Sequence, residues 1–250
     1  MSINISKLKP TKKTKSALIV GSGASLDHLP YPTISAFFSR NAYVISMNDT
    51  WILPGLEYDY IINHHTLKEL DEKYLNTYQE HIEKNPFIHV HPFYDCCNPL
   101  RGKTKYTGQF YQYHGLPVCE TTNIFIDPLV NPRKDYLFVG GSILFDAIGL
   151  AFHLGCKDLY FIGVDGGVVD NHSYCSEYRK HWPEDDFYTI GHSLRTMAGL
   201  RAFMAWAKPR GWTFTNISQR MGNADPQPTE IDWEVHTGGW GFEIIEKCPV

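Results

Sequence analysis

The chain has 250 residues, 43% of them hydrophobic, which is enough to bury the core of one large α/β domain. Its formal net charge of -4 argues against the broad basic field that drives nucleic-acid binding, and no apolar run is long enough to span a membrane. Its six cysteines show no repeated Cys-x-x-Cys spacing, which indicates free thiols rather than a disulfide framework or a structural zinc site.

The first 16 residues are rich in lysine and poor in apolar side chains. Such a composition predicts a flexible basic leader, because there is little apolar surface whose burial could order it. A specific tether to an anionic surface is the alternative. We expect one nucleotide-sugar-binding α/β domain over residues 17–250.

The first half of that domain alternates short apolar runs with polar residues. Residues 17–20, 43–47, 58–62 and 87–91 predict strands, and residues 66–84 have helical periodicity. Residues 92–134 mix Gly, Pro, Asn and aromatic residues without a clear period, which predicts a long functional loop or a small lid insertion.

In the second half of the domain, the residues that begin and end helices and strands are easier to recognise. Gly140, Gly141 and Ser142 open a predicted helix over 143–154, and a strand over 158–164 ends at Asp165. A helix over 194–208 and a strand over 213–217 follow. The alternation predicts a single Rossmann-like α/β domain with a mainly parallel sheet, helices on both faces and a loop-rich lid. The residues that follow strands, among them Gly21, Asn48, Asn63 and Asp165, should then share the carboxyl edge, where such sheets bind ligands.

A glycine-rich turn follows the first strand, with the sequence Gly21-Ser22-Gly23-Ala24-Ser25-Leu26. Backbone N–H groups in such a turn can approach the oxygens of a phosphate, although a tight turn without a ligand is the alternative. Leu26 stands where a dinucleotide fingerprint has its third glycine, and no acidic residue follows at the ribose-binding distance, so an NAD enzyme is disfavoured.

Three further residues have the chemistry of a nucleotide or catalytic site. Asn48 and Asn63 end consecutive strands, where an amide can donate and accept hydrogen bonds toward a base or sugar, although asparagine is also a common turn residue. His192 precedes a predicted helix and could act as a general base on a hydroxyl, or be structural. The His64-His65 and His89-x-His91 pairs lack acidic partners at metal-binding spacing, so no metal site is predicted.

Several of these segments, in this order, resemble the bacterial sialyltransferases of glycosyltransferase family 42 and the related superfamily of archaeal 6-hydroxymethyl-dihydropterin diphosphokinases. The resemblance covers roughly residues 17–218. It rests on the Gly21–Leu26 turn, Ser46-Met47-Asn48, Asn63, the run from Gly140 to Asp165, and Tyr188-Thr189-Ile190-Gly191-His192-Ser193. The last element resembles the sialyltransferases in particular.

The resemblance implies a metal-independent, inverting transfer of a sialic-acid-like sugar from a CMP donor to a glycan or protein hydroxyl, without a further cofactor. His192 would be the catalytic base, Tyr174 would hydrogen-bond the leaving phosphate, and the donor would lie against Ser22, Asn48, Asn63 and Ser142. With the residues read directly from the sequence, the candidate binding set is Gly21, Ser22, Gly23, Ser25, Asn48, Asn63, Gly141, Ser142 and Asp165.

The sequence departs from the sialyltransferase pattern on the loop after Asp165. Residues 166–169 are Gly-Gly-Val-Val where the first of two tyrosines is expected, which leaves Tyr174, with Tyr178 or His172 as substitutes. One alternative is a diphosphokinase moving pyrophosphate from ATP to a hydroxymethylpterin-like substrate, with Mg²⁺ held by Asp165 and Asp170. Another is a nucleotide-binding module without chemistry.

We expect a cytoplasmic protein, with peripheral association at the inner membrane face as a second option. Its partners would be the nucleotide-sugar donor and the acceptor. Compact transferases often form symmetric homo-oligomers, but no pattern in the sequence identifies an interface between subunits.

Overall fold

The computed structural model describes residues 3–62, 88–92, 110–117, 136–139, 142–165, 172–180, 200, 203–204 and 206–220. Its strands are β1 Ile3–Asn4, β2 Ser16–Val20, β3 Tyr43–Met47, β4 Tyr60–Ile62, β5 Ile88–Pro92, β6 Phe110–Pro117, β7 Tyr136–Val139, β8 Asp158–Ile162 and β9 Thr213–Asn216. The α-helices are α1 Tyr31–Ser39, α3 Ile143–His153 and α4 Ser176–Arg179, and the 3₁₀ helices are η1 Ile5–Lys7, η2 Ala24–His28, η3 Asn48–Ile52, η6 Lys208–Arg210 and η7 Ile217–Arg220.

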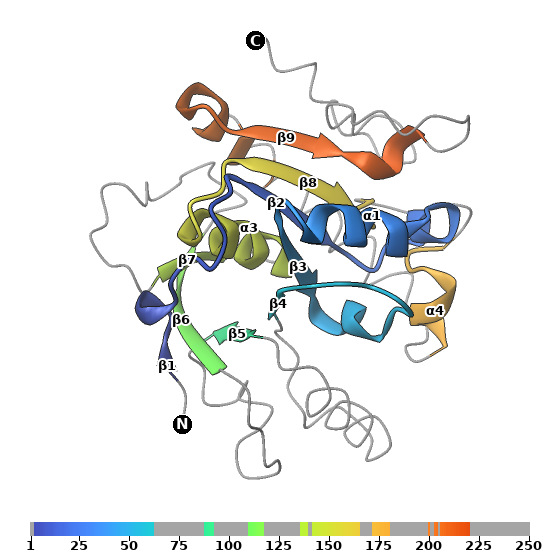
Figure 1. Ribbon diagram of the computed structural model, residues 1–250, viewed down its shortest axis with the longest axis horizontal. Helices are drawn as coiled ribbons and strands as arrows, with labels where there is room; N and C mark the ends of the chain where they lie inside the picture. Colours follow the sequence, from blue (N-terminus) through green and yellow to red (C-terminus); the bar gives the residue numbers. More distant parts are fainter. Residues whose placement is uncertain are drawn as a thin grey trace.

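The described strands form a sheet in the order β1-β6-β5-β4-β3-β2-β8-β9, with β7 paired to β6 (Figure 1). All their pairings are parallel. The central strands β2 and β3 are almost wholly buried, as expected for a parallel sheet that is covered on both faces. The predicted α/β class with a mainly parallel sheet is therefore confirmed.

Alternate residues of the central strands enter two separate cores. Ala17 and Ile19 of β2 pack with α3 and with Leu200 and Phe203 on one face. On the other face, Leu18 and Val20 of β2 pack with residues of η2, α1 and α4. The two-residue period of a strand thus places helices on both faces of the sheet.

Residues 3–16 differ from the flexible leader that their composition predicts. β1 pairs with β6, and the side chains of Ile5 and Leu8 are buried in the core. Lys12 Nζ donates to the carbonyl oxygens of Ser39 (2.7 Å) and Ala42 (2.9 Å) and to Asp59 Oδ2 (2.7 Å). A few apolar residues and one half-buried lysine therefore attach a mostly polar segment to the domain.

The predicted lid also differs from the structure in part. Residues 110–117, inside the stretch predicted as a loop or lid over 92–134, form β6, which pairs with β1, β5 and β7. The remainder of that stretch beyond Pro92 lies outside the described residues. Within the described part of the chain, no helix combines the length and hydropathy needed to cross a membrane.

Candidate functional site

The strand order reverses between β2 and β8. From β2 the chain continues outward to β3 and β4 on one side, whereas β8 and β9 lie on the other side of β2. In open α/β sheets, ligands bind beyond the carboxyl ends of the strands at such a reversal. In Figure 1 the arrowheads of β8 and β9 point toward the side of the molecule where α4 lies.

The turns that follow β2 and β8 are hydrogen-bonded to each other beyond the ends of the strands. Gly21 N donates to Ile162 O (2.9 Å), and Gly23 N donates to Gly163 O (2.8 Å). Ser25 N then donates to Asp165 Oδ2 (2.8 Å). Because three of its amides already have partners within the protein, the Gly21–Ser25 turn does not offer them to a phosphate, which differs from the predicted cradle.

Two glycines are required by the close approach of these turns. A Cβ atom on Gly21 or Gly23 would lie under 3.0 Å from Gly163 O, and one on Gly23 would also collide with the Asp165 carboxylate. Gly23 has φ -61° and ψ 154°, which any residue adopts, so space rather than backbone conformation requires glycine there. The two glycines therefore reflect the close packing of the turns after β2 and β8 rather than a binding site for phosphate.

Asp165 occupies the place where an external anion would bind. Its side chain is buried, and besides the Ser25 amide it accepts a hydrogen bond from Ser25 Oγ. These bonds place a carboxylate at the start of η2. The first amide groups of a helix have no hydrogen-bond partner within the helix and therefore favour a negative charge there. The protein's own carboxylate therefore satisfies the amides that the sequence assigned to a phosphate.

Asn216, the last residue of β9, and Ser218, two residues later, hold the turn at Gly163 in place. Gly163 N donates to Ser218 Oγ (2.9 Å), and Asn216 Nδ2 lies 3.4 Å from Val164 O. Asn216 Oδ1 in turn accepts from Ser218 N (3.0 Å). Sequence reasoning missed both residues, although their place at the end of a strand was a signal that they lie at the carboxyl edge.

The segment that carries Tyr174 is attached directly to the glycine-rich turn. Tyr174 forms an antiparallel bridge with Gly23, and Cys175 N donates to Ser22 O (2.9 Å). Ser22 and Tyr174 are half-buried, so both present part of their surface to solvent. The structure thus brings together Gly21, Ser22, Gly23, Ser25, Asp165 and Tyr174 of the predicted site.

Tyr178 lies beneath Tyr174. The two ring centroids are 4.9 Å apart, and Tyr178 is buried. Burial raises the pKa of Tyr178 well above its usual value, the nearby Asp49 raises it further, and a hydrogen bond with Ser22 acts in the opposite direction. Tyr178 therefore keeps its proton at neutral pH and supports Tyr174 and Ser22 from within the fold.

Asn48 begins η3 directly after β3 and is half-buried. Its φ of 47° lies in the left-handed region, which asparagine tolerates better than most residues other than glycine. Because η3 packs against α4, Asn48 lies on the same side of the sheet as the Tyr174 segment. Its predicted position at the carboxyl edge is confirmed.

Ser142 has a structural role in the described residues. It is the N-cap of α3, and its hydroxyl accepts from Leu144 N (3.3 Å). The other three predicted site residues, Asn63, Gly141 and His192, lie outside the described residues, as does Asp170.

The structure assigns no metal-binding cluster to the described residues, since none of them form a group of three or more His, Cys, Asp or Glu side chains placed to hold an ion. Two of the six cysteines are described, and both are buried free thiols. Burial raises the pKa of Cys175 to about 11 and that of Cys156 to about 12, so neither is a reactive thiolate at neutral pH.

No protein-family model and no curated protein matches the sequence. Among solved structures, the chain is similar to the MAf glycosyltransferase from Magnetospirillum magneticum AMB-1, with 18% identity and a TM-score of 0.42. The match covers 65% of this chain and 25% of that one, so this chain corresponds to about a quarter of that protein's length.

Proposed function

We propose that the protein is a metal-independent, inverting glycosyltransferase that takes a sialic-acid-like sugar from a CMP donor. The observation that carries the proposal is the grouping of three partly exposed polar side chains, Ser22, Asn48 and Tyr174, at the carboxyl edge beside the strand reversal. Hydroxyl and amide groups of this kind recognise a nucleotide and its sugar without bearing charge.

The transfer needs a base for the acceptor and a donor of hydrogen bonds for the leaving group. The acceptor oxygen forms a bond to the anomeric carbon, the bond from that carbon to the CMP phosphate breaks, and His192 takes the acceptor's proton. The Tyr174 hydroxyl donates a hydrogen bond to the departing phosphate as its negative charge grows. Transfer of the proton to His192 and of the sugar to the acceptor completes the step with no change of oxidation state.

Asp165 constrains where the donor phosphate can lie. Its buried carboxylate would repel a phosphate placed against the Gly21–Ser25 amides, and those amides already have partners. We therefore place the donor phosphate on the side of the Gly21–Ser25 turn where Tyr174 lies. The engagement of Asp165 with Ser25 also weighs against the diphosphokinase, which would need this carboxylate for Mg²⁺.

Turnover of CMP-activated sialic acid and related acids in the presence of a chelator tests the proposal. Wild type should release CMP, and His192→Ala should slow release about 10²- to 10⁴-fold, because a positioned general base contributes about that much. Tyr174→Phe should lower kcat about 10²-fold through loss of a leaving-group donor.

Tyr160→Phe is the matched control, because Tyr160 is a half-buried tyrosine within β8 that packs on Phe38 away from the carboxyl edge. It should leave CMP release unchanged. Activity that disappears on chelation and returns with Mg²⁺, or a Tyr174→Phe protein as active as wild type, would contradict the proposed mechanism.

A further inference from the structure

The amino edge of the sheet, opposite the candidate site, carries a concentration of positive charge. We define the basic edge by its residues: Lys7, Lys9, Lys13, Lys15, Lys157, Lys208 and Arg210. All are exposed except Lys208, which is half-buried. The whole chain has a net charge of -4, so this concentration is local and leaves the rest of the chain more acidic than the whole.

Hydrogen bonds show that the members of the basic edge are neighbours in space. Lys157 N donates to Lys15 O (2.7 Å), and Lys157 Nζ donates to Arg210 O (3.2 Å). His153 at the end of α3 bonds through Nε2 to Leu8 O (3.1 Å), which holds Lys7 and Lys9 near the same end of the sheet. Segments that are far apart in the sequence thus form one charged surface.

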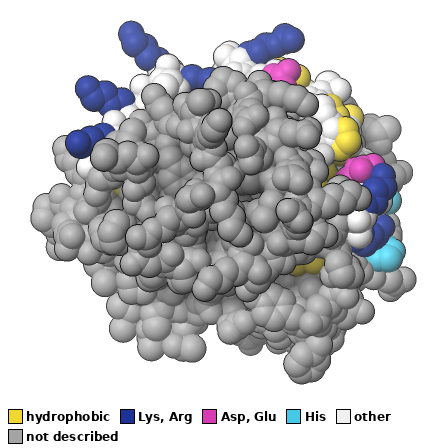
Figure 2. Space-filling view, turned by 90° about the horizontal axis from the view of Figure 1, so that it is seen from below, with side chains coloured by type: hydrophobic (Ala, Val, Ile, Leu, Met, Phe, Trp, Pro, Cys, Tyr) yellow, Lys and Arg dark blue, Asp and Glu magenta, His cyan; other side chains and the backbone are white. Residues whose placement is uncertain are grey.

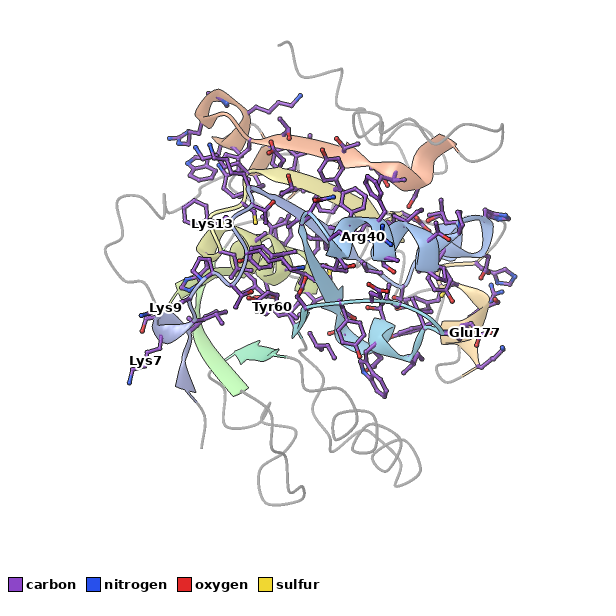
Figure 3. All side chains as sticks on the ribbon, in the orientation of Figure 1. Lys7, Lys9, Lys13, Arg40, Tyr60 and Glu177 are labelled. Carbon is purple, nitrogen blue, oxygen red and sulfur yellow. The ribbon has the colours of Figure 1, made fainter. Side chains whose placement is uncertain are left out.

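The segments that form the basic edge contain few acidic residues that could neutralise its positive charge. Residues 3–16, 155–158 and 206–213 contain a single acidic residue, Asp158, which is half-buried and accepts from Thr213 Oγ1 (2.9 Å). Lys12, by contrast, is paired with Asp59 and belongs to the fold rather than to the surface. Figure 3 shows Lys7, Lys9 and Lys13 on the side of the molecule opposite Glu177, and Figure 2 shows Lys and Arg side chains projecting at the upper left, with others at the top and the right rim.

We propose that the basic edge docks the protein on an anionic phospholipid membrane. Clusters of four to eight Lys or Arg residues are attracted to anionic leaflets, and each charge strengthens binding about fivefold. A docked molecule holds the amino edge of its sheet against the headgroups and keeps the carboxyl edge, with Ser22, Asn48 and Tyr174, turned away from the membrane.

The composition of the edge favours a lipid surface over a nucleic acid. Six of its seven cations are lysines, which are mobile point charges suited to a fluid array of phosphates, whereas bidentate base readout favours arginine forks and single-strand binding uses exposed aromatic rings. The single arginine is already engaged, because Arg210 Nη1 donates to Trp206 O (2.7 Å) and its guanidinium lies 4.6 Å from the centre of the Trp206 ring.

Co-sedimentation of the full chain with phosphatidylcholine vesicles, with and without phosphatidylserine, tests the proposal. Wild type should bind only the vesicles that contain phosphatidylserine, and salt should release it because surface charges are screened. A Lys13→Gln/Lys15→Gln/Lys157→Gln variant removes three exposed charges and should bind about 100-fold more weakly.

Lys157→Glu and Lys180→Glu form a matched pair, because both reverse one exposed lysine but Lys180 lies at the end of α4. Only Lys157→Glu should weaken vesicle binding. Equal binding to both kinds of vesicle, equal effects of the paired variants, or stronger binding to a single-stranded oligonucleotide than to the anionic vesicles at the same salt would overturn the proposal. None of these readouts depends on the proposed transferase activity.

Discussion

Gly23 and Asp165 show how single residues set the geometry of the candidate site. Gly23 allows the turn after β2 to approach the turn after β8 so closely that Asp165 can accept from both the amide and the hydroxyl of Ser25. The carboxylate then occupies the space above Gly23. The site is therefore built on two turns that act as one unit, with little room for added atoms between them.

Gly23→Ala should lower the free energy of unfolding by about 2 kcal/mol, because overpacking in a tightly packed region typically costs about 1–3 kcal/mol. Gly155→Ala is the control: Gly155 has φ +83° and open space around its Cβ position, so the cost there is backbone strain of about 1 kcal/mol. Urea unfolding of both variants measures the difference. A Gly23→Ala protein no less stable than Gly155→Ala would contradict the close packing described.

The sequence predicts where the single site residues lie better than it predicts their hydrogen-bond partners. The Gly21–Ser25 turn and Asp165 are recognisable because glycines and an acidic residue follow apolar runs. Their contact spans 140 residues of sequence, so no local pattern reveals that Asp165 satisfies the amides of the turn. Ser142 shows the same limit, since an N-cap serine and a ligand-binding serine have the same local sequence.

The segment before β2 shows what composition fails to predict about an element. Composition averages over residues 1–16, whereas attachment depends on a few of them, chiefly Ile5, Leu8 and Lys12. The strand over 110–117 was missed for a related reason, since its Gly115 and Pro117 are atypical of strands and its place depends on partners distant in sequence. By contrast, residues 136–139 are a run of four apolar residues before Gly140 that could have indicated β7.

Ile5→Ala should destabilise the protein by about 2–4 kcal/mol, because truncating a fully buried aliphatic side chain leaves a cavity. The melting temperature should fall by about 5 °C or more for a protein of this size. Lys7→Ala, two residues away and exposed, should change it very little. Thermal unfolding of both variants decides between an attached segment and a flexible leader, for which neither change would matter.

His153, the last residue of α3, should make the attachment of residues 3–16 depend on pH. Burial lowers the pKa of His153 below its usual value, and the bond to Leu8 O opposes that shift in part. The folded protein therefore keeps His153 neutral while the unfolded chain binds a proton below about pH 6.5, so stability from this group is present above that pH and lost as the pH falls. His153→Gln keeps a donor for Leu8 O without a titrating group.

As the pH falls from 7 through about 6.5 and below, the free energy of unfolding of wild type should fall more steeply than that of His153→Gln. Chemical denaturation at a series of pH values measures both slopes, and the comparison cancels the contribution of the other histidines. Parallel slopes for the two proteins would show that His153 is not held neutral against Leu8.

At the scale of the whole molecule, the sheet has the candidate site at its carboxyl edge and the basic edge at the opposite end of its strands. The carboxyl edge joins the turns after β2, β3 and β8 with the Tyr174 segment, and the amino edge collects the exposed lysines that precede β2 and β8. The alternation of strands and helices in the sequence was sufficient to predict the fold class and the shared carboxyl edge. It did not indicate the strand order, which depends on long-range pairing.

Calorimetric titration of the wild-type protein with CMP in the presence of a chelator tests the proposed CMP-sugar site, with CDP, UDP, ADP, ATP and NAD titrated alongside, each with and without Mg²⁺. We expect CMP to bind without metal and more tightly than the other nucleotides, and saturating CMP to raise the melting temperature because it binds only the folded state. Binding of ATP that requires Mg²⁺ and exceeds that of CMP, or the absence of any nucleotide binding, would contradict it.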